Sequence, residues 1–143
     1  MLYIDSSILL EAYLSQPRKN EALKIMGRAE PKVSSWLLAI EVPIVLRRLL
    51  SSNARNKALL AAALAQFDKD KRGISLMEGL AALSARVQHD PRFSSCRALD
   101  AIHTAAALQF QETANHPVYV ATFDQRLQAL AGSLGLRTVP TAP

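Results

Sequence analysis

Cysteine, glycine and aromatic residues are all scarce in this chain of 143 residues. A single cysteine, Cys96, excludes an internal disulfide framework and is typical of a reducing compartment. The five glycines form no glycine-rich loop of the kind that cradles phosphates. With one Trp, three Tyr and four Phe, platforms for stacking single-stranded bases are few. Any contact with a nucleic acid would therefore depend mainly on charge.

Long apolar runs are also missing. The longest apolar stretch, residues 58–65, is too short to span a bilayer. The N-terminal segment MLYIDSS has neither the basic residues nor the apolar run of a signal peptide. We therefore expect a cytoplasmic protein that makes no use of a membrane. Half of the residues are hydrophobic and 20% are charged, which is typical of a globular chain and too apolar for disorder.

Basic residues outnumber acidic ones. The formal net charge is +5, from 17 Lys and Arg against 12 Asp and Glu. Such an excess favours phosphate polymers or an acidic protein as partners, although solubility alone can also account for it. The length is sufficient for a hydrophobic core, and we expect one domain spanning residues 1–143.

Segments with strand and helix patterns alternate along the chain. Short apolar or β-favouring segments predict strands over residues 2–4, 32–35, 74–77, 117–121 and 136–139. Apolar residues at helical spacing predict helices over residues 8–14, 18–29, 36–50, 53–70, 79–88, 99–111 and 123–134, with a polar loop over 89–96. This alternation indicates an α/β fold, a three-layer sandwich in which helices cover both faces of a central parallel sheet of four to five short strands.

Two helix starts need a specific prediction. Ser6 and Ser7 precede the first helical run, and we expect their hydroxyls to cap it. Pro43 interrupts the run over 36–50. We expect that helix to begin near Ile40, which would place Pro43 in its first turn, and a kink at Pro43 is the alternative.

Four acidic residues lie where a metal site could form: Asp5, Glu41, Asp100 and Asp124. Asp5 closes the first predicted strand, and Asp124 follows the fourth. Ligand sites in parallel α/β sheets lie beyond the C-terminal ends of the strands, so both carboxylates share one rim if these strands are neighbours. Glu41 and Asp100 would reach that rim from helices. Burying a carboxylate among apolar residues costs free energy unless its negative charge is balanced. A divalent cation balances that charge and can also activate water for catalysis.

Each of these acids also has a simpler interpretation. Aspartate is a common helix N-cap, and a helical Glu can point into solvent. His103, one turn after Asp100, could be a metal ligand, but the other candidate ligands are all oxygen atoms. We therefore interpret His103 as a core histidine or as one that supports a ligand.

Four segments carry a resemblance to a known family: YIDSS (3–7), AIEV (39–42), LDAIHTAAAL (99–108), and VATFDQRL (120–127) followed by LGLRTV (134–139). In this order and spacing the chain resembles PIN-domain ribonucleases of the VapC toxin type. The resemblance implies a PIN-like fold in which Asp5, Glu41, Asp100 and Asp124 are catalytic and bind Mg²⁺ or Mn²⁺. The hydroxyl residues that match positions near such a site are Ser6, Ser7 and Thr122.

The resemblance also implies a metal-dependent endoribonuclease, a phosphodiester hydrolase in which an activated water attacks RNA and leaves a 5′-phosphate and a 3′-hydroxyl. On this hypothesis Asp5 and Asp100 are the principal metal ligands. Asp124 completes the set or holds a second ion, and Glu41 binds the metal through water or orients the attacking water. The partners implied are RNA, a second copy of the chain in a homodimer, and a VapB-type antitoxin.

A basic rim is needed because four carboxylates repel RNA. The foremost candidates for RNA contacts are Arg47, Arg48, Arg92 and Arg97, joined by Arg55, Lys57, Lys69, Lys71 and Arg72.

The sequence motifs of two competing protein classes are absent. A haloacid-dehalogenase-type phosphatase needs a second Asp two residues after the first, where this chain has Ser7, and the acids of a response-regulator receiver are not visible. The alternative kept is a non-catalytic or weakly catalytic PIN-like module that binds nucleic acid or protein. Such a module would be marked by the loss of an acid, and all four are present.

Overall fold

The computed structural model describes residues 1–14, 16–50 and 54–141, with the side chains of residues 54, 55 and 80 also outside the description. The elements of the described part are β1 (Leu2–Ile4), α1 (Ser6–Tyr13), α2 (Lys19–Met26), β2 (Lys32–Ser35), α3 (Leu38–Leu50), α4 (Ala54–Lys71), β3 (Ile74–Met77), α5 (Leu80–His89), a short 3₁₀ helix (Pro91–Phe93), α6 (Ala98–Ala114), β4 (Tyr119–Ala121), α7 (Gln125–Ser133) and β5 (Arg137–Val139).

The strands form one sheet in the order β3-β2-β1-β4-β5, and each pairing among the described residues is parallel. The chain builds outward from β1 to β2 and β3, then returns to place β4 on the other side of β1. The direction of strand order therefore reverses between β1 and β4, which is where ligands bind in open α/β sheets. The first and fourth strands are adjacent, which is the condition under which Asp5 and Asp124 share one rim.

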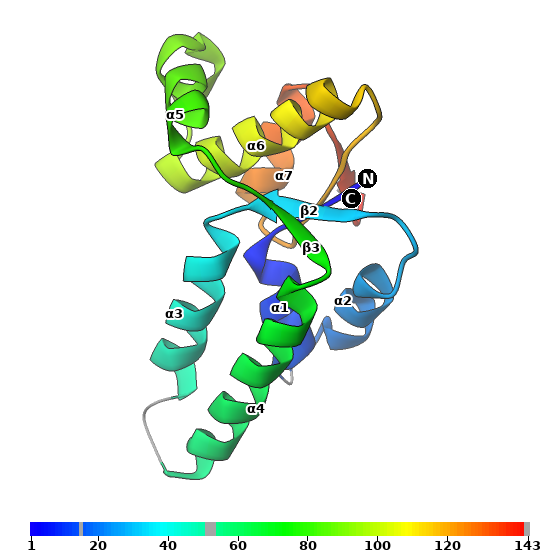
Figure 1. Ribbon diagram of the computed structural model, residues 1–143, viewed down its shortest axis with the longest axis vertical. Helices are drawn as coiled ribbons and strands as arrows, with labels where there is room; N and C mark the ends of the chain where they lie inside the picture. Colours follow the sequence, from blue (N-terminus) through cyan, green and yellow to red (C-terminus); the bar gives the residue numbers. More distant parts are fainter. Residues whose placement is uncertain (15, 51–53, 142–143) are drawn as a thin grey trace.

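Helices cover both faces of this sheet, so the predicted α/β sandwich is confirmed (Figure 1). Helices α1 to α4 pack on one face, and α5, α6 and α7 pack on the other. Alternate residues of β1 point to opposite faces: Leu2 and Ile4 join the first core, and Tyr3 joins the second. All three side chains are fully buried, which explains an apolar strand without polar alternation.

Most predicted elements agree with the structure to within a few residues. The strands over 2–4, 32–35 and 74–77 are as predicted, while β4 and β5 begin slightly later than expected. Helix α6 is longer at both ends than predicted, and the expected polar loop contains the 3₁₀ helix. The predicted start of the fourth helix at residue 53 lies outside the described residues.

The expected capping of α1 by Ser6 and Ser7 was wrong, while the simpler interpretation of Asp5 as a helix N-cap is confirmed. Asp5 is the N-cap, because its backbone is extended and its carboxylate accepts a hydrogen bond from the Ser7 amide. Ser6 and Ser7 lie inside the first turn instead. A carboxylate at this position also has a favourable interaction with the helix dipole.

The expected late start of α3 was also wrong. The helix begins at Leu38, and Pro43 lies inside it. The amides of Ile40 and Glu41 already donate to the carbonyl of Leu37, so the first turn is complete before the proline is reached. Buried Val42 and Leu46 hold the helix against the core, which offsets the hydrogen bond that Pro43 cannot donate.

Among the described residues, no helix combines the length and apolar character needed to cross a bilayer.

Candidate active site

One cavity of about 340 Å³ collects all four predicted acids. It lies beyond the C-terminal ends of β1 and β4, the point where strand order reverses. Asp5 arrives from the end of β1, Glu41 from α3, Asp100 from the first turn of α6 and Asp124 from the start of α7. Ser6 and Ser7 also line it. Residues from four separate elements therefore share one pocket.

Asp5 is held by donors that all bind the same oxygen. Its Oδ2 accepts from the Ser7 amide at 3.2 Å, the Ser7 hydroxyl at 2.5 Å and the Thr122 hydroxyl at 2.8 Å. Within the described residues no hydrogen-bond donor reaches Oδ1. Since this atom is also absent from the fully buried polar atoms that lack a partner, it is accessible from the cavity side. The side chain is only 5% exposed, so a buried carboxylate is fixed on one side and open to the cavity on the other.

Thr122 links Asp5 to Asp124. Its hydroxyl donates to Asp5 and accepts from the Asp124 amide at 3.0 Å. The Ser7 hydroxyl extends this contact by accepting from the Phe123 amide at 2.9 Å. The predicted hydroxyl residues Ser7 and Thr122 thus orient an acid, while for Ser6 the structure gives a place on the cavity wall.

Asp124 combines the two interpretations that the sequence left open. Its Oδ1 caps α7 by accepting from the amides of Arg126 and Leu127, at 2.8 and 3.4 Å. The same side chain lines the cavity. Capping uses one carboxylate oxygen, so the negative charge stays available to the pocket.

Asp100 lies in a repulsive environment. Burial raises its pKa above the usual value, and the charge of Asp124 raises it further, while Arg97, His103 and Arg126 act in the opposite direction. A carboxylate whose charged form is disfavoured by a second carboxylate is stabilised by a bound cation. Small residues of α6 such as Ala101 and Ala105 are fully packed, which lets this helix lie close enough to bring Asp100 to the rim.

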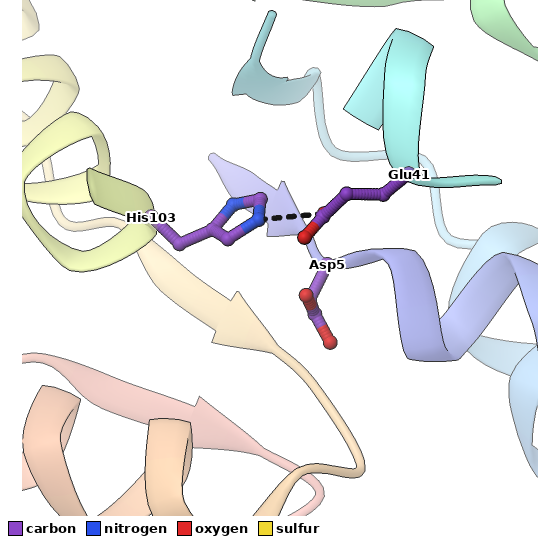
Figure 2. Close-up of side chains that lie close together, drawn as sticks. All are labelled: Asp5, Glu41 and His103. Carbon is purple, nitrogen blue, oxygen red and sulfur yellow. Dashed lines mark hydrogen bonds and ion pairs between the residues drawn. The ribbon is translucent and has the colours of Figure 1, made fainter. Parts of the chain in front are cut away.

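Glu41 pairs with a buried histidine. Its Oε2 lies 2.8 Å from Nε2 of His103, and Nδ1 of His103 lies 2.8 Å from the Tyr3 hydroxyl. Figure 2 shows Glu41 and His103 pointing toward one another from α3 and α6, with Asp5 beside them. Burial opposes the charged form of His103, but Tyr3, the hydrogen bond to Glu41 and the charges of Asp5 and Glu41 outweigh it and raise its pKa well above the usual value.

The tightest group of possible ligand atoms in the described residues is Asp5, Glu41 and His103, all within 4.8 Å of one another. Asp100 and Asp124 line the same cavity without belonging to this group. Both ring nitrogens of His103 already have hydrogen-bond partners. His103 could therefore offer a nitrogen to a cation only by giving up one of these hydrogen bonds, and the prediction that Asp100 is a principal metal ligand stays a prediction.

Known proteins share this sequence pattern. The pattern of the PIN domain family matches residues 2–133. The chain belongs to the PIN domain family. It is also similar to ribonuclease VapC46 of Mycobacterium tuberculosis (strain ATCC 25618 / H37Rv), with 28% identity over 141 residues, covering 96% of this chain and 95% of that protein. The family resemblance inferred from the four sequence segments is confirmed.

The arginines of this PIN domain differ in how available they are. Arg97 lines the acidic cavity, and a second cavity of about 430 Å³ shares Arg97 and Asp100 with it and adds Arg126. Arg92 is engaged by Asp90, with a 2.6 Å contact from its guanidinium, so its charge is largely neutralised. Arg47 and Arg48 are exposed in the last turn of α3. The side chain of Arg55 lies outside the described part.

Arg126 is the functional candidate that sequence reasoning missed. It lies two residues after Asp124 in the VATFDQRL segment, and this closeness to a predicted site residue was the signal in the sequence that could have identified it. Its proximity to Asp100 depends on α7 packing beside α6, and no local pattern reveals that packing.

Proposed function

We propose that this PIN domain is a metal-dependent endoribonuclease that hydrolyses phosphodiester bonds of RNA. The observation that carries the proposal is the convergence of Asp5, Glu41, Asp100 and Asp124 on one cavity. The similarity to ribonuclease VapC46 supports RNA as the substrate class.

The donor set fits Mg²⁺ or Mn²⁺. Carboxylate oxygens are the ligands that these cations prefer, and Oδ1 of Asp5 has no competing donor among the described residues. The mutual repulsion of Asp100 and Asp124 adds a second reason to bind a cation. We assign the ligand positions to Asp5, Asp100 and Asp124, with Glu41 bound directly or through water.

The chain's own groups then have separate tasks. When bound, the cation lowers the pKa of water and neutralises charge on the phosphate under attack. Ser7 and Thr122 hold Asp5 in place, and Glu41 orients the attacking water. No covalent link between protein and RNA is needed, because water is the nucleophile: its oxygen bonds to phosphorus as the bond to the 3′ oxygen breaks, and a proton from the water balances the departing 3′-hydroxyl.

RNA would approach over the second cavity. Arg97 and Arg126 line it beside Asp100, and the structure gives neither side chain an ion pair among the described residues. A phosphate bound there lies next to the metal cavity. These two cations offset the repulsion between the four acids and the RNA backbone.

We further propose that the chain is the toxin of a toxin–antitoxin pair that acts in the cytoplasm as a homodimer, inhibited by a VapB-type antitoxin. Apolar side chains are exposed on α3 and α4, namely Ile40, Ile44, Leu49 and Leu59. Exposed apolar groups of this kind are suited to a protein partner. The similarity to VapC46 supports this assignment.

Purified protein incubated with structured RNA tests the function directly. We expect cleavage with Mg²⁺ or Mn²⁺ and none with excess chelator. Asp5→Asn and Asp100→Asn should each lower cleavage by at least about 100-fold while the fold stays intact, because neither change removes much packing. Undiminished cleavage by either variant refutes the role of that residue.

The alternative is a PIN-like module that binds nucleic acid or protein with little or no catalysis. It predicts RNA binding that is insensitive to chelator and unchanged in Asp5→Asn. The same preparations distinguish the two functions when binding and cleavage are measured side by side.

A further inference from the structure

Tyr3, His103 and Glu41 form a continuous hydrogen-bonded chain from the core to the cavity. The Tyr3 hydroxyl lies 2.8 Å from Nδ1 of His103, and Nε2 of His103 lies 2.8 Å from Oε2 of Glu41. Tyr3 is fully buried and His103 is 3% exposed. The three residues come from β1, α6 and α3, so the chain joins helices that pack on opposite faces of the sheet.

The backbone of β2 donates to the Tyr3 hydroxyl and leaves its proton available to a neutral His103. The Ser35 amide donates to the Tyr3 oxygen at 3.0 Å, which leaves the hydroxyl proton free to point at Nδ1 of His103. A neutral His103 that accepts at Nδ1 carries its proton on Nε2 and donates it to Glu41. The protonated ring donates from both nitrogens, from Nδ1 to the Tyr3 oxygen and from Nε2 to Glu41. The contact with Glu41 is therefore the same in both charge states of the histidine.

Glu41 gains a fixed orientation from this contact. Its flexible side chain is 20% exposed at the edge of the cavity, and Oε2 is the atom that His103 binds. Among the described residues no donor reaches Oε1. One oxygen is thus held by the protein and the other remains available, which is the same arrangement that Ser7 and Thr122 give Asp5.

We propose that Tyr3 and His103 are positioning residues that hold Glu41 so that its free oxygen faces the cation or the attacking water. His103 acts through Glu41 and does not bind the metal. This role rests on the proposed function, since it presumes that the acidic cavity is a metal site. Hydrogen-bond partners of this kind typically contribute about 10- to 100-fold to metal affinity or activity.

Calorimetric titration of Mn²⁺ alone into the full chain is the first readout, and kcat and KM for RNA cleavage at saturating Mn²⁺ are the second. His103→Leu removes the donor while keeping an apolar side chain of similar length. Tyr3→Phe removes the hydroxyl that orients His103 and accepts from the Ser35 amide. We expect both to weaken Mn²⁺ binding and lower kcat by about 10-fold or more, with KM for RNA unchanged. His103→Gln, whose amide nitrogen occupies a position like Nε2, should recover most of the loss.

Tyr13→Phe is the matched control. It also removes one tyrosine hydroxyl that donates at 2.8 Å to a side chain, here Asp70, but the pair joins α1 to α4 and neither residue lines the cavity. We expect its Mn²⁺ affinity to equal that of the unaltered chain. Circular dichroism checks that each variant is folded. If His103→Leu does not fold, Tyr3→Phe and His103→Gln test the positioning role.

Three results would overturn the positioning role. Mn²⁺ affinity and kcat could be unchanged in the folded variants. Tyr13→Phe could weaken Mn²⁺ binding as much as Tyr3→Phe, which would indicate a general loss of stability. His103→Gln could be as damaging as His103→Leu while Tyr3→Phe has no effect, which would make His103 itself a ligand. The proposed nuclease function fails separately: it is wrong if Mn²⁺ binds as described and no RNA is cleaved.

Discussion

The Thr122 hydroxyl donates to the Asp5 carboxylate over 2.8 Å, although the two residues lie 117 positions apart in the sequence. The contact exists because β1 and β4 are adjacent, with Ile4 opposite Ala121, so the residues that follow each strand meet at one edge. The same hydroxyl accepts from the Asp124 amide. A single side chain therefore sets the positions of two acids of the cavity.

Replacing Thr122 by Val tests this linkage. Valine keeps the shape of the side chain but leaves Asp5 with one donor fewer and the Asp124 amide without its acceptor. We expect Mn²⁺ affinity to fall by about 10-fold and unfolding free energy to fall by about 1–3 kcal/mol. Thr138→Val is the control, because Thr138 lies in β5 and does not line the cavity. Equal Mn²⁺ affinity in the two variants would contradict the linkage.

Asp100→Asn should stabilise the metal-free protein at neutral pH. The pKa of Asp100 is raised by burial and by Asp124, so its charged form is less favourable in the folded state than in the unfolded state. The stability that this group contributes is complete below its unfolded pKa, near 3.9, and is lost as pH rises through the higher folded pKa. Asn removes that loss, and the gain at pH 7 is at most about 1 kcal/mol because solvent screens the pair.

Denaturant unfolding of wild type and Asp100→Asn in chelator, measured between pH 3 and pH 8, checks this expectation. The two curves of stability against pH should converge at the acidic end and separate as pH rises. A variant that is less stable than wild type at pH 7 would show that Asp100 forms a stabilising contact even without a cation.

Divalent cations should raise the thermal stability of the protein. Binding to the folded state alone adds about 2.7 kcal/mol when Mn²⁺ is present at 100 times its Kd, which raises Tm by several degrees for a chain of this size. Asp5→Asn should abolish most of this shift, because Oδ1 of Asp5 is the open oxygen of the buried carboxylate. Scanning calorimetry with Mn²⁺ and with chelator measures it, and an equal shift in the variant would exclude Asp5 as a ligand.

Arg97→Gln and Arg126→Gln should weaken RNA binding and reduce its dependence on salt. Each arginine that neutralises a phosphate of single-stranded RNA contributes about 0.7 to the slope of log K against log salt. The double variant should lower the slope by about 1.4 in filter binding by the Asp5→Asn protein, which prevents cleavage during the measurement. Arg137→Gln carries the same change of charge as either single variant but lies on β5, and a slope lowered as much as in a single variant would point to net charge alone.

Local sequence patterns were sufficient to predict the order of helices and strands and to name the four acidic residues that line the cavity. An apolar run such as Leu2–Ile4 is readable because a strand buried on both faces has no room for polar residues. Asp5 and Asp124 could be placed on one rim on the condition that their strands are neighbours, because the C-terminal ends of parallel strands lie at the same edge, and the pairing of β1 with β4 meets that condition. The start of α3 could not be read in the same way. Burial of Val42 and Leu46 holds Pro43 within the helix, and burial depends on what packs against it.

The sequence by itself determined which chemical groups are present and which end of each element carries them, because periodicity and strand ends are local properties. Only the tertiary structure decided that Glu41 pairs with His103, that Arg126 joins Arg97, and that Asp124 caps a helix while lining the cavity. The first of these contacts joins helices on opposite faces of the sheet, the second depends on α7 packing beside α6, and the third depends on the adjacency of β1 and β4. Their geometry follows from strand order and helix packing, and no window of neighbouring residues contains that information.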